Sequence, residues 1–421
     1  MTLSKKIIFS FIVALFSVVV VLIGGELIAQ TSQMTKLRYW SAFVPDDDLA
    51  WRVRPNSTFE VEWYPGIKQT ITSNSDGLRD TKNPEDIDHD KTVVMLQGDS
   101  NILGFGIQSE ELLSKHLADS LANYDKGVEV INGGTSGYDL QHYVLQMEKL
   151  NERYQQDYNF IIFNMDNDYV SSLLSSSYLV SRPYYDLVDG ELVHHDREFR
   201  VPSQMRGLEY VRSLEEYDED IAPFFARKKR PVLGGIVGQS FLAHALYSRF
   251  QSRYAGSRWS GSKLEKYLIG EKPAKTYSDS EYNRSSLLLN YFFYLKEWPE
   301  PYIEGHKLIS KLFEHYQRFD KTKTVVILMP AKGVIMEPEK TKEMVVKYSE
   351  GKGEVDLEKF SRLMQTTLDN IGMDYINLEP LFKNHANRDE LFLKNNDHIS
   401  PVAHKMIADE IASYLKTKQV N

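Results

Sequence analysis

The sequence predicts a three-layer α/β/α sandwich with a parallel sheet, preceded by one transmembrane helix. From residue 91 onward, short β-branched apolar runs alternate with amphipathic helical stretches, which is the pattern of a parallel sheet covered by helices on both faces. The chain has 421 residues and is 42% hydrophobic, enough for one large domain or two modest ones. We divide it into an anchor over residues 1–30, an extension over 31–90 and the sandwich over 91–421.

The anchor is predicted from an almost wholly apolar run over residues 7–29. A helix of this length extends about 34 Å, enough to cross a bilayer. Lys5 and Lys6 precede the run, so the positive-inside rule places the N-terminus in the cytoplasm and the following chain in the periplasm. A cleaved signal peptide is the alternative, but the run is longer than an ordinary signal and Leu27 stands where cleavage requires a small residue. We therefore expect a single-pass protein of the inner membrane.

The extension contains a predicted β-hairpin. Residues 57–64 and 66–74 alternate apolar and polar side chains, and Pro65-Gly66 between them is a turn signal. We expect a small antiparallel hairpin ahead of the sandwich.

The sandwich itself is predicted from apolar runs and helical periodicity. Four runs are the expected strands of the sheet: residues 91–97, 128–133, 159–165 and 324–330. A helix is expected from about Ser109, where leucines begin to recur at three- and four-residue spacing, and another over residues 141–153. The last helix is expected after Ser400-Pro401, because Ser at the N-cap and Pro at the first position begin helices.

An insertion over about residues 170–300 interrupts the alternation and is rich in aromatic residues and arginine. Asp189-Gly190 predicts a tight hairpin within it. Residues 240–254 and 285–298 are expected to be helical, so the insertion is predicted to be mostly helical. Its aromatic side chains either pack it onto the core or line a groove for carbohydrate or lipid.

Composition excludes several classes of function. The chain has 50 basic and 59 acidic residues, a net charge of −9, and the charges are interspersed, so no nucleic-acid partner is expected. It has no cysteine, which excludes a lipoprotein anchor, disulfides and thiolate chemistry.

Polar turns follow three of the predicted strands, at Gly98-Asp99-Ser100, residues 132–137 and residues 166–168. Ligands bind at the carboxyl ends of strands in open α/β sheets. A serine nucleophile requires a base within hydrogen-bonding reach and donors aimed at the developing oxyanion. With His398 in the loop before the last helix, these turns contain the parts of such a site.

The sequence resembles the SGNH/GDSL hydrolase family in four blocks that occur in the family's order: VVMLQGDSNILGFGI, INGGTSGYDLQ, FIIFNMDNDY and NNDHISPVAHKMIADEI. The resemblance covers roughly residues 51–415 and implies a flavodoxin-like fold. It implies that Ser100 is the nucleophile and contributes its backbone N–H to the oxyanion hole. It also implies Gly137 and Asn167 as the other oxyanion donors and His398 as the general base.

The sequence departs from the family pattern at two places. Met165 stands where the third block usually has glycine. The aspartate that orients the histidine usually lies two or three residues before it, where this chain has Asn396 and Asn395. Either the adjacent Asp397 bends round to orient His398 as a triad acid, or the pair works as a dyad aided by an amide or a backbone carbonyl.

The segment SNSDGLRD, residues 73–80, resembles that of a membrane-linked subset of these proteins. The resemblance implies an esterase or acyltransferase that acts on O-acetyl groups of a cell-envelope or exported polysaccharide. It implies no cofactor, and it implies a membrane acyl-transfer protein as a candidate partner. Two alternatives remain: a non-catalytic subunit that binds glycan or scaffolds an acylation complex, and a lipase or phospholipase.

The other titratable side chains are interpreted as structural. Asp99 is expected to hold the nucleophile turn by local hydrogen bonds. His194, His195 and Asp196 leave the predicted hairpin in consecutive positions, where neighbouring side chains face opposite ways, so a solvated strand end is favoured over a metal site. Three histidines on predicted helices complete this group: His116, His142 and His404.

Overall fold

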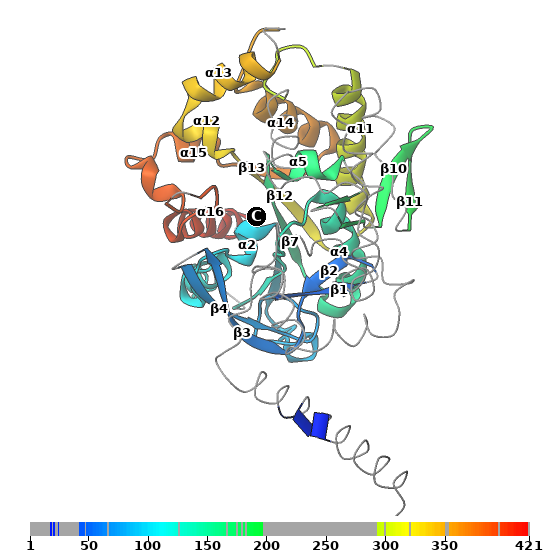
Figure 1. Cartoon of the computed structure of the whole chain (residues 1–421), viewed down its shortest axis with the longest axis vertical. Helices are drawn as coiled ribbons and strands as arrows, with labels where there is room; N and C mark the ends of the chain where they lie inside the picture. The colour runs from blue at the N-terminus through cyan, green and yellow to red at the C-terminus, as the bar shows by residue number, and fades with distance from the viewer. Residues whose placement is uncertain are drawn as a thin grey trace, which may run out of the picture.

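The computed structural model describes residues 42–196 and 293–419, apart from a few positions within these ranges, and a few residues between 17 and 24. At its centre is a five-stranded parallel sheet (Figure 1) with the order β13-β12-β7-β5-β6. Its strands are β5 (Thr92–Gln97), β6 (Val128–Asn132), β7 (Tyr158–Asn164), β12 (Lys323–Met329) and β13 (Asp374–Asn377). In chain order this is the 2-1-3-4-5 arrangement of flavodoxin-like folds. The prediction of a parallel sheet is confirmed.

Helices cover both faces of the sheet because alternate strand residues enter two separate cores. On β7, Ile161 and Phe163 pack with one group of helices, and Phe160 and Ile162 pack with another. The first group is α4 (Leu140–Tyr154), α11 (Glu300–His315) and α14 (Lys359–Ile371), and the second is α3 (Leu113–Ser120) and α16 (Pro401–Gln419). The remaining helices are α2 (Ser100–Leu103), α5 (Asn167–Ser172), α12 (Lys332–Met336), α13 (Pro338–Tyr348) and α15 (Glu379–Lys383).

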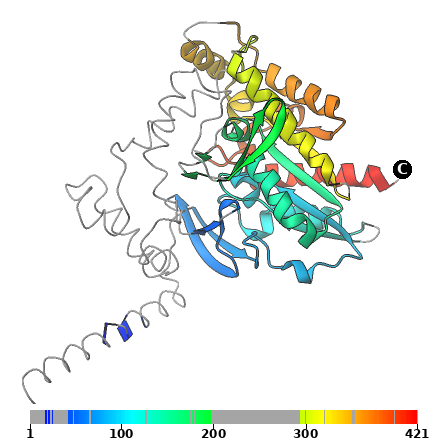
Figure 2. The same cartoon turned by 90° about the vertical axis from the view of Figure 1, so that its right-hand side faces the viewer.

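Two antiparallel hairpins precede the sandwich, β1 (Phe43–Asp46) with β2 (Ala50–Val53) and β3 (Ser57–Tyr64) with β4 (Ile67–Ser73). The second is the predicted hairpin, which is confirmed. Figure 2 shows both hairpins against the body of the protein. Trp51 and Val61 from the hairpins share the core that contains Leu103 and Tyr138 of the sandwich. The described part of the extension is therefore packed as part of the domain.

The described part of the insertion begins with two hairpins, β8 (Ser176–Ser177) with β9 (Val180–Ser181) and β10 (Tyr184–Val188) with β11 (Glu191–His195). The turn of the second is Asp189-Gly190, with φ of 52° and 85°, as predicted.

Of the two helices predicted in the insertion, the structure describes only the last residues of the second. The helix expected over residues 240–254 lies outside the described residues, as does most of the one expected over 285–298. At the described end, 293–298, the helix prediction is wrong: Leu295 forms a β-bridge with Val355, and Lys296 N–H donates to the Glu354 carbonyl at 2.8 Å. Phe293, Tyr294 and Leu295 are consecutive and all buried, whereas one face of a helix buries residues three or four apart. The segment therefore pairs with a distant strand-like segment and does not form a helix.

Within the described residues, no helix has the length and apolar character needed to span a membrane. The predicted span, residues 7–29, lies largely outside them and stays a prediction.

The four predicted strands agree with the structure to within one residue, but two features differ. The fifth strand, β13, has no residue that is fully buried, so its sequence carries no apolar run. The helix expected from Ser109 begins at Leu113, because Leu112 is extended and residues 109–111 form a separate 3₁₀ turn. Further 3₁₀ turns lie at Pro84–Asp86, Tyr316–Arg318 and Arg388–Leu391.

Candidate active site

The candidate nucleophile lies where β5 ends. Gly98 follows the strand, and a Cβ at this position would lie 2.2 Å from Ile102 Cγ1, so only glycine allows the short helix α2 to pack so closely. Asp99 is the N-cap of α2, and its Oδ1 accepts the Asn101 backbone N–H at 2.8 Å. Burial raises the pKa of Asp99. Its predicted role in holding the turn is confirmed, and Ser100 is the first residue of the helix.

The side chains of Ser100 and His398 meet at this point. Ser100 Oγ lies 2.7 Å from His398 Nε2, although 298 residues separate them in the chain. Ser100 is 5% exposed, and burial lowers the pKa of His398 to about 4. The imidazole is therefore neutral at pH 7 and is able to accept a proton. The Phe105 ring stacks on it with centroids 4.0 Å apart and an 11° interplanar angle.

Asn396 holds the other ring nitrogen. Its Oδ1 contacts His398 Nδ1 and also accepts the His398 backbone N–H at 2.9 Å. An amide oxygen only accepts hydrogen bonds, so Nδ1 carries the proton and Nε2 is left to accept the Ser100 hydroxyl. Asn396 thus fixes the tautomer that a general base requires.

Asp397 does not reach the ring, so its assignment as the triad acid is corrected. Its side chain is 94% exposed and lies 3.7 Å from Lys332 Nζ. The side chain of Asn396 turns toward His398, and neighbouring side chains of an extended chain face opposite ways, so the side chain of Asp397 faces solvent. Of the alternatives left open by the sequence, the geometry agrees with a dyad aided by an amide. Asn395 lies outside the described residues.

The two expected oxyanion donors lie on loops beside the nucleophile. Gly137 is in a turn that Tyr138 N–H closes onto the Thr135 carbonyl at 3.1 Å. Thr135 N–H in turn donates to the Gly98 carbonyl at 3.0 Å, which ties the turn to the nucleophile loop. Asn167 begins α5, after β7, and its Nδ2 lies 3.4 Å from Asp99 Oδ2.

A fully buried carboxylate supports the Asn167 loop. Asp168 accepts hydrogen bonds from the Tyr143 hydroxyl at 2.9 Å and the Asn164 backbone N–H at 2.8 Å. Burial, and then the nearby charge of Asp99, raise its pKa well above the ordinary value. Asp168 therefore anchors the end of β7 and does not face the reacting atoms.

Sequence reasoning missed the side chain that joins the two catalytic loops. Asn101 donates through Nδ2 to Asp99, and its Oδ1 accepts the Ile399 backbone N–H at 3.0 Å. It thus connects the nucleophile helix to the residue after His398. The only signal in the sequence was its place directly after Ser100.

The extension holds the loop that follows the nucleophile. Arg79, from the segment 73–80, donates to the carbonyls of Leu103, Gly104 and Ile107 at 2.8–3.0 Å. Gln69 Nε2 also donates to the last two. Burial lowers the pKa of Arg79 to about 9. These bonds fix the loop that bears Phe105, and hence the ring that covers the histidine.

The last helix begins as predicted and contains a structural histidine. Ser400 Oγ accepts the Ala403 backbone N–H at 3.4 Å, and Pro401 is the first helical residue. His404 is fully buried, and its Nδ1 accepts the Leu113 backbone N–H at 2.9 Å.

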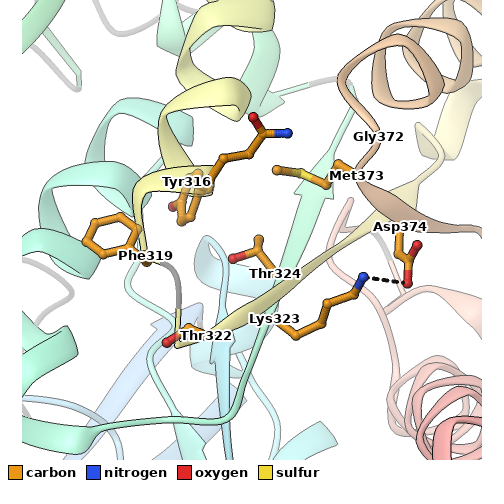
Figure 3. Close-up of a pocket in the computed structure, with 9 residues that line it drawn as sticks. Tyr316, Phe319, Thr322, Lys323, Thr324, Gly372, Met373 and Asp374 are labelled. Carbon is orange, nitrogen blue, oxygen red and sulfur yellow. Dashed lines mark ion pairs between the residues drawn. The ribbon is translucent and has the colours of Figure 1, made fainter.

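A cavity of about 280 Å³ lies elsewhere, at the amino ends of β12 and β13 (Figure 3). Lys323 and Asp374 form an ion pair at its edge, at 3.1 Å. Ser100 follows the carboxyl end of β5, and all five strands are parallel. The cavity therefore lies at the opposite ends of the strands and is not part of the candidate site. Within the described ranges, no cluster of three or more histidines and carboxylates is placed to hold a metal ion.

No protein-family model matches the sequence, and no curated protein matches it significantly. Among solved structures, the lipase/acylhydrolase from Enterococcus faecalis is 10% identical, with a TM-score of 0.34, over 78% of this chain and 96% of that one. The psychrotrophic esterase EstA from Pseudoalteromonas sp., in its form inhibited by monoethylphosphonate, is 11% identical, with a TM-score of 0.33. The match covers 79% of this chain and 100% of that one.

Proposed function

We propose that the protein is a serine esterase or acyl-transfer enzyme with Ser100 as nucleophile and His398 as general base. The observation that carries the proposal is the 2.7 Å contact between Ser100 Oγ and His398 Nε2, with Nδ1 held by Asn396. A neutral imidazole in this tautomer is the form able to accept the serine proton.

The reaction proceeds in two half-reactions. His398 takes the proton of Ser100 as Oγ attacks the ester carbonyl, and the negative charge develops on the carbonyl oxygen. The C–O bond to the leaving group then breaks, the leaving alkoxide takes the proton from His398, and an acyl-serine remains. Water or an acceptor hydroxyl then gives its proton to His398 as its oxygen attacks the acyl carbon. The bond from the acyl carbon to Ser100 Oγ breaks, and Oγ takes the proton back from His398, which restores the neutral imidazole.

Three donors are proposed for the oxyanion: the backbone N–H groups of Ser100 and Gly137 and the side-chain amide of Asn167. Asn167 Nδ2 lies 3.4 Å from Asp99 Oδ2, and an amide nitrogen has two protons. We propose that one proton is donated to Asp99 and the other to the oxyanion of the substrate. A donor that is fixed before the reaction costs no reorganisation during it.

The proposed substrate is an O-acyl, in particular O-acetyl, group of a cell-envelope or exported polysaccharide, with the catalytic domain in the periplasm. The apolar run at residues 7–29 and the segment 73–80 support this location and class.

A second candidate is a non-catalytic subunit that binds glycan or scaffolds a membrane acylation complex. The specific observation in its favour is the neutral Asn396 at the histidine, which stabilises an imidazolium less than a carboxylate does. Such a protein keeps the fold without turnover.

Turnover by the full-length chain in detergent separates these functions. Short-chain aryl acetates, acetylated glycans and long-chain esters are offered to the wild type, Ser100→Ala and His398→Ala, with Ser361→Ala, a buried serine on α14, as the matched control. We expect acetyl-ester turnover that Ser100→Ala and His398→Ala abolish and Ser361→Ala leaves unchanged. A preference for long-chain esters indicates a lipase, and the absence of Ser100-dependent turnover favours the non-catalytic subunit. Transfer to an added glycan distinguishes a transferase from a hydrolase.

A further inference from the structure

Trp51 joins the extension to the turn that contains Gly137. Its indole N–H donates to the Ser136 carbonyl at 2.9 Å, across 85 residues of sequence. Both residues are buried, with Trp51 5% and Ser136 2% exposed. Because Ser136 directly precedes Gly137, this bond is made to the same peptide unit that carries the Gly137 N–H.

The orientation of that peptide unit decides where the Gly137 N–H points. The turn runs from Thr135 to Tyr138, and Gly137, its third residue, has a φ of +79°, which is typical of a type II turn. Type I and type II turns differ by a flip of the central peptide. In a trans peptide the C=O and N–H groups point in opposite directions. A bond that holds the Ser136 carbonyl toward Trp51 therefore directs the Gly137 N–H away from Trp51.

The indole is itself held in place by its neighbours. It packs edge-to-face against the rings of Tyr138, at 5.8 Å, and His142, at 4.9 Å. The Tyr138 hydroxyl donates to the Trp51 carbonyl, so Trp51 donates to one residue of the turn and accepts from another. The hairpin that bears Trp51 is joined to α4 by Asp46, whose carboxylate oxygens lie 2.8 and 2.9 Å from Lys149 Nζ. Trp51 is thus a fixed donor.

We propose that Trp51 is a positioning residue of the oxyanion hole: it holds the Ser136–Gly137 peptide in the type II orientation, so that the Gly137 N–H faces the developing oxyanion. The inference rests on the proposed function, since it requires Ser100 to attack an ester carbonyl. A flipped peptide presents a carbonyl oxygen in place of the N–H and opposes the negative charge that develops there. The extension then completes the active site from outside the sandwich.

The direct test is Trp51→Phe in the full-length chain, which keeps a buried aromatic ring and removes the donor. Loss of a whole oxyanion donor costs about 10²–10³ in kcat, so its misorientation is expected to lower kcat by about 10- to 100-fold. KM stays within about twofold, because the donor acts in the transition state. The matched control is Trp298→Phe, which removes an indole bond to the Phe293 carbonyl at 2.9 Å and is expected to leave kcat within about twofold.

A second measurement separates positioning from a loss of folded protein. Each variant is assayed with a matched oxoester and thionoester. Sulfur accepts hydrogen bonds weakly, so the oxyanion donors favour the oxoester. The ratio of the two rates, taken on one sample, does not depend on the folded fraction. We expect it to fall at least about tenfold in Trp51→Phe and to stay unchanged in Trp298→Phe.

The outcomes distinguish the two proposals. An unchanged ratio in Trp51→Phe, beside wild-type turnover that depends on Ser100, overturns the positioning role and leaves the proposed function intact. Absence of any Ser100-dependent turnover in the wild type overturns both.

Discussion

Placing a carboxylate at the histidine by Asn396→Asp is expected to move the pH dependence of the enzyme. In the wild type, burial lowers the pKa of His398 from 6.5 to about 4, and the only side-chain acceptor at Nδ1 among the described residues is a neutral amide. A negative charge this close to a titrating group raises its pKa by about 1–3. The acid limb of kcat/KM is therefore expected to move from near pH 4 to between about pH 5 and 7.

The plateau rate is expected to rise as well. Asn396 already sets the tautomer, so the carboxylate adds only stabilisation of the imidazolium that forms in the transition state. About 1.4 kcal/mol of such stabilisation corresponds to a tenfold higher kcat. Lys332, whose Nζ donates to the Asn396 backbone carbonyl, provides a nearby cation that favours the new charge.

The assay is kcat/KM of an aryl acetate from pH 3.5 to 9, with the thermal midpoint recorded at each pH. Asn377→Asp, an equivalent change at the end of β13, is the control and is expected to leave the acid limb in place. If the acid limb of Asn396→Asp coincides with that of the wild type, Asn396 is not the group that faces the imidazole during the reaction.

The remaining predictions concern one exposed and two buried titratable side chains. Asp397→Asn is expected to change kcat/KM by less than about twofold, because this exposed side chain does not reach His398; a loss of 10²-fold or more restores Asp397 as the triad acid. Arg79→Met leaves the buried Leu103 carbonyl without its donor, while Gln69 Nε2 still donates to the Gly104 and Ile107 carbonyls. At about 1–3 kcal/mol for an unpaired buried carbonyl, we expect the free energy of unfolding in urea to fall by about 1–3 kcal/mol; a loss below about 0.5 kcal/mol contradicts this. Burial lowers the pKa of His404 to about 3, below its unfolded value near 6.5, so its contribution to stability is present above pH 6.5 and is lost as the pH falls toward 3. His404→Gln is therefore expected to reduce the slope of unfolding free energy against pH by about 1.4 kcal/mol per pH unit near pH 5, and an unchanged slope shows that His404 is not buried in its neutral form.

The sequence was sufficient for those parts of the fold that depend on local pattern. Four β-branched runs predicted four strands, and Ser400-Pro401 predicted the start of the last helix, because apolar burial and capping act over a few residues. The strand β13 escaped prediction because it is short and only half-buried. At residues 293–298 pairing with a distant segment overrode a helical pattern.

The candidate site divides in the same way. Ser100 and His398 were predicted from their blocks, and the structure brings their side chains together. The choice between Asn396 and Asp397 was not predictable, since it depends on how one loop bends. The bond from Trp51 to Ser136 crosses 85 residues and leaves no periodic signal, so only the folded structure reveals it.

The central claim is that Ser100 carries an acyl group during turnover. Its most direct test is intact-mass measurement of the full-length chain, acid-quenched during reaction with an aryl acetate, followed by peptide mapping. The account predicts one acetyl group on the peptide that contains Ser100 in the wild type and none in Ser100→Ala. A chain that turns over the ester with no acyl group on Ser100, or that remains equally acetylated in Ser100→Ala, contradicts it.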